Sequence, residues 1–278
     1  MTGTIQGTND FTDNKIKTSR KRVLSALASY IADLYNPQLP ILLEEIARLN
    51  GITYNYGNYQ DYFDGMLEHL AGEFHIFINI DKAAKGSPRS RFTFSHELGH
   101  YFINEHRQAL ESGLVPSHSS YTNFQSENMV ELEADYFASC LLMPDVRFNN
   151  DCDGKAFNPT LIDVMTAKYN VSATSFLLRY TYSNHVPVMV ICTKDSKIKW
   201  KWESDDFEFK YLKSIKKSIP HVSATAEFYK KGTEYNIPQD LFAEDWFNYT
   251  EYEANTFKIK EYCIYAKRYD MVLTVLWY

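Results

Sequence analysis

The 278-residue chain has few cysteines, and none of them lie close together. Its four cysteines, Cys140, Cys152, Cys192 and Cys263, form no Cys-x-x-Cys motif. This spacing argues against a disulfide framework and against a zinc site made of cysteines alone. A chain that needs no disulfides suits the reducing cytoplasm, which is the location that we predict.

The sequence also lacks a long apolar run and an excess of positive charge. No hydrophobic stretch approaches the roughly 20 residues needed to span a bilayer, so we expect no membrane segment. The net charge of −6 at pH 7 is not that of a dedicated nucleic-acid binder, and we do not expect direct nucleic-acid binding. The hydrophobic share of 45% is typical of a globular protein.

Two helices are predicted near the N-terminus, after a polar tail. Residues 1–17 are rich in Thr, Gly, Asn and Asp, which predicts a flexible tail. A helix is expected over Ser19–Tyr35, and a second one, over Ile41–Leu49, follows Pro40. The apolar residues of the first helix that recur with helical spacing are Val23, Leu27, Tyr30, Ile31 and Leu34.

A β-prone section comes next. Strands are predicted at Ile52–Tyr56, Gly65–Leu70 and Glu73–Ile80, and Ala71-Gly72 is a plausible hairpin turn between the last two. We interpret Glu73–Ile80 as a sheet edge just before the following helix. Such an edge can bind a substrate backbone by adding a strand.

His96-Glu97-Leu98-Gly99-His100 is a His-Glu-x-x-His motif within a helix predicted over Arg89–Glu105. His96 and His100 lie one turn apart on the same face, so both can direct a ring nitrogen at one metal ion. Glu97 lies beside them, close enough to take a proton from a metal-bound water. The motif therefore predicts a zinc hydrolase with Glu97 as its general base.

Three residues are candidates for the third ligand. Glu131 and Asp135 lie one helical turn apart, so Glu131 can bind zinc while Asp135 accepts a hydrogen bond from a ligand histidine. Glu133 points roughly 200° away from Glu131 and cannot share its role. His106 has the spacing of the metzincin motif, but Ile103 stands where that motif has glycine. We favour Glu131 and keep Glu133 and His106 as alternative ligands.

The carboxylates belong to a second helix, predicted over Glu127–Met143 after a polar loop, His106–Gln125. Two short helices are then predicted within 159–182, and their connection resembles a helix-turn-helix unit. Because the second of them carries only one basic residue, Arg179, we predict a packing role and not DNA contact.

The composition changes after residue 184. We predict an α+β protein: a flexible tail (1–17), a metallopeptidase domain of helices with a small β-sheet (18–184, including the helical pair 159–182), and a smaller, mainly β C-terminal domain (185–278) whose position favours a regulatory or partner-binding role. The segments that we expect there are the strands Val186–Thr193, Ile198–Glu203, Ala243–Thr250, Phe257–Ala266 and Met271–Trp277, and a solvated helix at Tyr211–Ile219.

Two blocks of sequence carry a resemblance to a known family. The first is Arg91-Phe92-Thr93-Phe94-Ser95-His96-Glu97-Leu98-Gly99-His100, and the second is Glu131-Leu132-Glu133-Ala134-Asp135-Tyr136-Phe137-Ala138-Ser139-Cys140-Leu141-Leu142-Met143-Pro144. Together they resemble the ImmA/IrrE family of zinc metallopeptidases. The resemblance covers roughly residues 40–182.

This resemblance implies a zinc endopeptidase that cleaves a regulatory protein, typically a helix-turn-helix repressor, and so relieves repression. By the matching motifs, one Zn²⁺ ion per chain would be bound by His96, His100 and Glu131, with Glu97 as general base. A donor for the tetrahedral oxyanion is also expected, and the candidates are Tyr121, His118 and Arg91. The alternative is a non-catalytic or DNA-binding regulatory protein that relieves repression by binding.

Overall fold

The computed structural model describes residues 16–113, 118–120, 128–213, 218–248 and 257–278, which form two compact units. The N-terminal unit comprises residues 16–153 and 163–176, and the C-terminal unit comprises 154–162 and 177–278. Most of the predicted tail, 1–15, lies outside the described residues. This division does not test where an independently folding fragment would begin or end, so the boundary near residue 184 stays a prediction.

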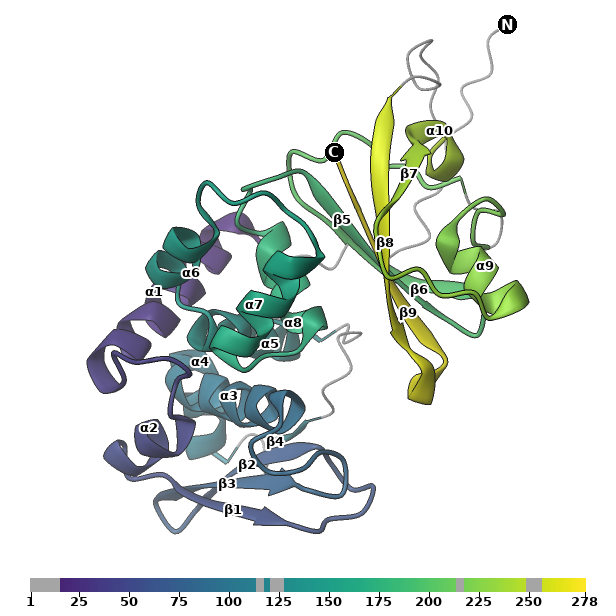
Figure 1. Cartoon of the computed structure of the whole chain (residues 1–278). Coiled ribbons are helices and arrows are strands. Elements are labelled where there is room, and N and C mark those ends of the chain that lie inside the picture. Colours follow the sequence, from purple (N-terminus) through teal and green to yellow (C-terminus); the bar gives the residue numbers. More distant parts are fainter. Residues whose placement is uncertain (1–15, 114–117, 121–127, 214–217, 249–256) are drawn as a thin grey trace, which may run out of the picture. The chain divides into compact units, whose positions relative to one another are not determined.

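The N-terminal unit consists of a small sheet and the helices packed on it (Figure 1). Helix α3 contacts strands β2 and β3 on one side, and it packs against α5, which in turn contacts α1. The elements are α1 (Thr18–Tyr35), α2 (Leu43–Leu49), β1 (Thr53–Gly57), β2 (Gly65–Leu70), β3 (Glu73–Asn79), α3 (Pro88–Phe102), α4 (Asn104–Glu111), β4 (His118–Ser120), α5 (Met129–Leu142) and α6 (Asp145–Cys152). Helices α7 (Pro159–Tyr169) and α8 (Ala173–Thr181), which match the predicted helical pair, are each divided between the two units.

The sheet of this unit has the strand order β1-β3-β2-β4, with β1 parallel to β3 and the other pairs antiparallel. The predicted hairpin turn is confirmed, because Ala71 and Gly72 both have positive φ angles, 52° and 87°. The interpretation of Glu73–Ile80 as a sheet edge is wrong. Strand β3 lies between β1 and β2, since β1 adds to it by a parallel pairing that no local pattern reveals. In the described part of the sheet, β1 and β4 are the outer strands.

Helix α1 buries a face that overlaps only in part with the one predicted. Val23, Tyr30 and Leu34 are each more than half exposed. Ile31 is buried as predicted, and the other buried residues are Leu24, Ser25, Ala28 and Ala32. Three of these have small side chains, which allow α1 to approach α5 closely, so packing geometry outweighs the larger apolar residues.

The helix that carries His-Glu-x-x-His is shorter than predicted and is followed by a second helix. It ends at Phe102, because Ile103 takes an extended backbone (φ −75°, ψ 110°) and buries its side chain. Helix α4 then begins at Asn104 and occupies the start of the segment predicted as a loop. The change of direction at Ile103 sets the position of His106, which follows it on α4.

The C-terminal unit is built on an antiparallel five-stranded sheet with the order β6-β5-β9-β8-β7 (Figure 1). One face of this sheet carries an apolar core that includes Met189, Ile191, Ile259 and Leu276 together with Trp246 of α10. The elements are β5 (Val188–Lys194), β6 (Lys197–Glu203), α9 (Ala224–Lys231), β7 (Gln239–Phe242), α10 (Ala243–Trp246), β8 (Lys258–Ala266), the 3₁₀ turn η1 (Lys267–Tyr269) and β9 (Met271–Trp277).

Two predicted segments of this unit differ from the structure, and neither α9 nor β7 was predicted. The strand expected at Ala243–Thr250 is the short helix α10, because the Asp245 carboxylate accepts a hydrogen bond from the Phe242 N–H and closes a helical turn; residues 249 and 250 lie outside the described residues. The helix expected at Tyr211–Ile219 is not helical in its described part, where Leu212 and Ser218 form isolated β-bridges.

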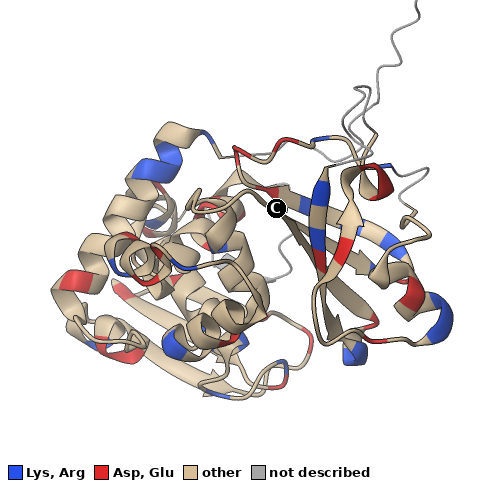
Figure 2. Ribbon diagram, turned by 45° about the horizontal axis from the view of Figure 1, so that its top comes forward, with Lys and Arg blue, Asp and Glu red and all other residues tan. Residues whose placement is uncertain are grey.

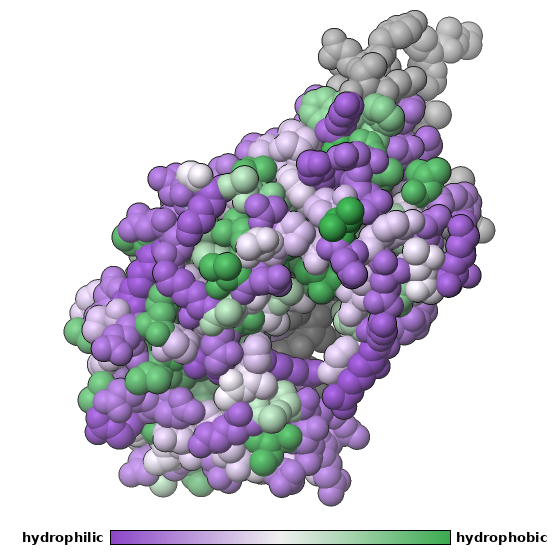
Figure 3. Space-filling view, in the orientation of Figure 1, coloured by the Kyte–Doolittle hydropathy of each residue, from purple (hydrophilic) through white to green (hydrophobic). Residues whose placement is uncertain are grey.

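The predicted fold class, α+β with a β-rich C-terminal part, is confirmed. Acidic and basic residues are interspersed along the described ribbon (Figure 2), in keeping with the small net charge. On the face shown in Figure 3, hydrophobic residues lie in small groups among polar ones. Among the described helices, none has both the length and the apolar character needed to cross a bilayer.

Candidate metal centre

Helix α3 carries both histidines of the motif into the interior of the N-terminal unit. It begins at a defined point, because the Ser87 side chain accepts a hydrogen bond from the Ser90 N–H and Pro88 occupies the first helical position. Every residue from Ser90 to His100 is buried, so this helix is surrounded by the unit and is not an ordinary amphipathic surface helix.

Helix α5 brings the carboxylates to the histidines. The Asn128 side chain caps its start by accepting a hydrogen bond from the Val130 N–H. Glu131 lies in the first turn, where the helix dipole favours a negative charge. The two helices touch at Gly99: a Cβ atom there would lie 3.3 Å from the Ala134 Cα and 3.1 Å from the Phe137 ring. The glycine of the first motif and the alanine of the second therefore allow the close approach that joins the ligand set.

His96, His100 and Glu131 form a compact group of three candidate ligands. The two Nε2 atoms of His96 and His100 are 3.0 Å apart, and they lie 3.3 and 3.6 Å from the Glu131 carboxylate oxygens. In a tetrahedral zinc site with bonds of about 2.0–2.1 Å, two ligand atoms are roughly 3.4 Å apart. The spacing and the two-nitrogen, one-carboxylate donor set therefore fit a zinc ion, and this group could hold a metal.

His96 is oriented by a carboxylate on the side away from this group. Its Nδ1 lies 2.8 Å from Oδ1 of Asp135, one turn after Glu131 on α5. This is the hydrogen bond predicted for Asp135, and it directs Nε2 toward the candidate metal position. Burial alone would lower the pKa of His96, but the hydrogen bonds with Asp135 and Glu131 outweigh it and raise this pKa well above its usual value. A bound cation would replace that proton, because a ligand imidazole must be neutral.

Glu97 is fully buried next to the ligand group, and among the described residues its carboxylate receives no well-formed hydrogen bond, although the Ser120 hydroxyl lies near it. Strand β2 passes directly over it: a Cβ atom at Gly65 would lie 2.5 Å from the Glu97 Oε1. Burial raises the pKa of Glu97 to about 8, although His96 and the nearby Ser120 hydroxyl counteract part of the rise. A divalent cation in the ligand group would lower this pKa. Glu97 is thus a carboxylate poised to exchange a proton.

The two alternative ligands are not in the group. Glu133 and His106 instead lie next to each other, with 3.4 Å between His106 Nε2 and the Glu133 Oε2. The other ring nitrogen of His106, Nδ1, is 3.2 Å from the His100 Nδ1. Both residues therefore lie behind His100, on the side away from Glu131.

Of the candidate oxyanion donors, only Arg91 has a described side chain. It is buried, and its guanidinium donates to the backbone oxygens of Ile41 (3.0 Å) and Asn170 (3.2 Å). Arg91 thus holds the fold together and is not directed at the metal position. Tyr121 lies outside the described residues, and so does the side chain of His118.

Three residues near the centre were not found from the sequence: Gly65, Ser120 and Arg20. Gly65 and Ser120 reach Glu97 from β2 and β4, and Arg20 reaches Glu133 from α1. A glycine at the start of a predicted strand was a signal that another group approaches it closely. No local pattern marks Ser120 or Arg20.

A buried His-Glu-x-x-His helix joined by a carboxylate from a neighbouring helix defines a site of the metallopeptidase class. The comparison with protein families agrees: residues 56–181 match the model of the Peptidase_M78 family, described as an IrrE N-terminal-like domain. Residues 56–181 are therefore similar to the Peptidase_M78 family, which confirms the resemblance found in the sequence.

A solved structure shares the fold over most of the chain. It is described as a Mycobacterium tuberculosis transcriptional regulator; the TM-score is 0.59 at 14% sequence identity, over 93% of this chain and 78% of that one. At this identity the likeness concerns the fold alone. The comparison with curated proteins found no match.

Proposed function

We propose that this protein is a zinc-dependent endopeptidase that hydrolyses a peptide bond in a regulatory protein. The observation that carries the proposal is the buried group of His96, His100 and Glu131, with the carboxylate of Glu97 beside it. The nitrogen and oxygen donors and their spacing suit zinc. A zinc ion held there would supply the Lewis acidity that amide hydrolysis requires.

Glu97 is the residue that we assign to proton transfer. In hydrolysis, a water oxygen forms a bond to the carbonyl carbon while Glu97 takes one of the water protons. The C–N bond then breaks, and Glu97 returns the proton to the leaving amine. Burial suits the task, because it raises the affinity of the carboxylate for the proton that it carries between the two steps.

The substrate backbone, we propose, lies along β4 and not along β3. In the described part of the sheet, β4 is paired only with β2, and its last residue, Ser120, lies near Glu97. An extended peptide added to this edge would place its carbonyl groups close to the proton acceptor. Cleavage in an extended conformation requires the substrate to be locally unfolded or flexible.

The proposed substrate is a helix-turn-helix transcriptional repressor, whose cleavage would relieve repression. Support comes from the family resemblance of the two motif blocks. The solved structure with the same fold is described as a transcriptional regulator, which agrees with a role in gene control. Direct DNA contact through α8 is less well supported, because its one arginine, Arg179, is buried.

The test is co-expression with a small helix-turn-helix repressor encoded beside this protein. We expect two repressor fragments, identified by mass spectrometry, and about one zinc per chain by metal analysis. Glu97→Gln should keep the zinc and leave the repressor intact. A repressor that is relieved but stays full length would instead favour the binding alternative. Salt-dependent binding of the protein to duplex DNA would favour the DNA-binding one.

A further inference from the structure

His100 contacts a chain of three side chains that reaches the surface. Its Nε2 faces His96 and Glu131, and its Nδ1 lies 3.2 Å from Nδ1 of His106. The far ring nitrogen of His106 is 3.4 Å from the Glu133 carboxylate. Arg20 donates two hydrogen bonds to the same carboxylate, from Nε at 2.9 Å and from Nη2 at 2.5 Å.

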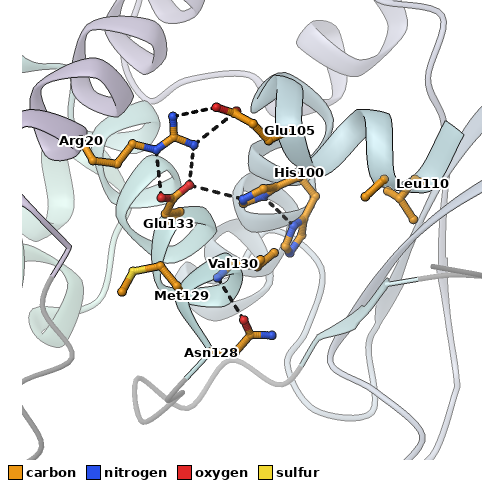
Figure 4. Close-up of a pocket in the computed structure, with 10 residues that line it drawn as sticks. Arg20, His100, Glu105, Leu110, Asn128, Met129, Val130 and Glu133 are labelled. Carbon is orange, nitrogen blue, oxygen red and sulfur yellow. Dashed lines mark hydrogen bonds and ion pairs between the residues drawn. The ribbon is translucent and has the colours of Figure 1, made fainter. Parts of the chain in front are cut away.

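Arg20 is itself held from two sides. Its guanidinium lies between Glu133 of α5 and Glu105 of α4, and its distance to the Glu105 Oε1 is 3.1 Å (Figure 4). Two nitrogens on one carboxylate make a planar, directional contact that fixes the orientation of Glu133. These side chains border a pocket of about 620 Å³, whose lining includes His100, His106 and Glu133.

The contacts between these side chains fit one direction of proton donation. Glu133, as a carboxylate, can only accept, so it favours a proton on the His106 Nε2. The His106 Nδ1 is then an acceptor for the His100 Nδ1–H. A proton on Nδ1 leaves the His100 Nε2 with its lone pair directed at the candidate metal position.

We propose that His106, Glu133 and Arg20 are positioning residues that hold His100 in the orientation and tautomer needed to bind the metal. His96 receives the same support directly from Asp135, at 2.8 Å. His100 receives it through one additional imidazole. The two residues that were weighed as alternative ligands thus act behind a ligand. The inference rests on the metal site of the proposed function.

The proposal also connects α1 to the metal centre. Arg20 lies on α1, outside the segment 56–181 that matches the family model. A residue supplied from beyond that segment therefore completes the support of a ligand within it. A shift of α1 along α5 would withdraw Arg20 from Glu133 and loosen His100.

The experiment measures zinc affinity by competition with a colorimetric chelator, for the full-length protein and matched variants. His106→Leu should weaken zinc binding by roughly 10- to 100-fold, the usual effect of removing a partner of a ligand histidine. His106→Asn has nearly the same shape as His106→Leu, but its Oδ1 can accept from the His100 Nδ1–H. It should therefore recover part of the affinity.

Arg20→Met should weaken zinc binding less than His106→Leu, since it acts one step further away. Its control is Arg107→Met, which removes an arginine of α4 that pairs with Glu111 and should leave zinc binding unchanged. Circular dichroism establishes that each variant is folded. If His106→Leu does not fold, the comparison of Arg20→Met with Arg107→Met decides.

Zinc affinity within twofold of wild type for both His106→Leu and Arg20→Met would overturn the inference. So would equal losses for His106→Leu and His106→Asn, because a packing role alone would treat the two alike. The proposed function fails separately: a Glu97→Gln variant that still cleaves the repressor would refute the assigned proton transfer and leave the zinc affinities of the His106 and Arg20 variants unaffected. A wild-type protein that binds no zinc would overturn both proposals.

Discussion

Two glutamates, one in each unit, are completely buried, and their surroundings differ. Glu261 in β8 accepts hydrogen bonds from the backbone N–H groups of Ala224 (3.0 Å) and Thr225 (3.2 Å) and from the Thr225 hydroxyl (3.1 Å). These groups form the start of α9, whose dipole favours a negative charge. Glu97 in α3 receives no well-formed hydrogen bond in the described part of its unit, and only the nearby Ser120 hydroxyl interacts with it.

The difference separates a carboxylate with a structural role from the one that we propose to be catalytic. Burying a carboxylate costs free energy unless hydrogen bonds replace the lost water. At Glu261 three hydrogen bonds offset part of this cost, and the side chain ties the helix to the sheet. Glu97 has no comparable set of donors, so its burial costs more. A group kept at such a cost is expected to serve chemistry.

The largest effect expected from changing either glutamate is on the rate of repressor cleavage. Glu97→Gln should reduce repressor cleavage by roughly 10³-fold, the contribution typical of a general base. The free energy of unfolding should not fall, because the neutral amide replaces a buried carboxyl whose ionisation burial opposes. Repressor fragments are quantified by mass spectrometry over time. His96→Ala, which should lose the zinc as well, is the control. Cleavage by Glu97→Gln within tenfold of wild type would contradict the assignment.

A pair of glycine substitutions should separate proton transfer from metal binding. Gly65→Ala places a methyl group 2.5 Å from the Glu97 Oε1, so we expect cleavage to fall roughly 10²-fold with zinc affinity unchanged. Gly99→Ala pushes against Ala134 and Phe137 and should weaken zinc binding, because it moves α3 away from Glu131. Rate and zinc affinity are measured for both variants. Identical profiles for the two would show that these glycines do not have separate roles.

For Glu261 the expected effect is on stability. Glu261→Ala leaves buried N–H groups of α9 without their acceptor, and should lower the free energy of unfolding of the C-terminal unit by about 2–4 kcal/mol. All four tryptophans, Trp200, Trp202, Trp246 and Trp277, lie in this unit, so their fluorescence during urea unfolding reports on it selectively. The exposed Glu208, changed to Ala, is the control. If Glu261→Ala were as stable as wild type, Glu261 would have no structural role and would not differ from Glu97 in this respect.

The smallest expected effect is on the pH dependence of stability. Burial raises the pKa of Glu261 above its usual value, although its hydrogen bonds oppose the rise. The folded protein then holds the proton to higher pH than the unfolded chain does, so this residue's contribution to stability falls as pH rises from the usual glutamate pKa through the folded value. The unfolding free energy of wild type, relative to Glu261→Gln, should decrease over that window. A constant difference would mean that the pKa is not raised.

The candidate ligands could be predicted because their spacing within each helix is visible in the sequence. His96 and His100 share a helix face by their spacing alone, and Glu131 and Asp135 repeat that spacing on a second helix. Strand alternation likewise predicted β2, β3 and their turn. Each of these features needs only neighbouring residues to be recognised.

What the sequence did not reveal depends on contacts between distant segments. The burial of Ile103 ends α3 early and turns His106 toward His100, and no residue pattern announces the break. Arg20 meets Glu133 across 113 positions of the chain. Small residues of α1 are buried, whereas larger apolar residues of the same helix are exposed. In each case, tertiary packing selects one of several conformations or pairings that the local sequence allows equally well.

The chain leaves the N-terminal unit and enters it again, so a single cut in the backbone can divide this unit between two fragments. Residues 163–176 belong to the N-terminal unit although 154–162 do not. They are tied to α6 by the hydrogen bond from the Tyr169 hydroxyl to Asp151 and by the contacts of Phe148 with Tyr169 and Phe176. A protease that nicked the chain after Asp153 would therefore split one unit across two fragments. The fragments should stay associated and separate only under denaturing conditions.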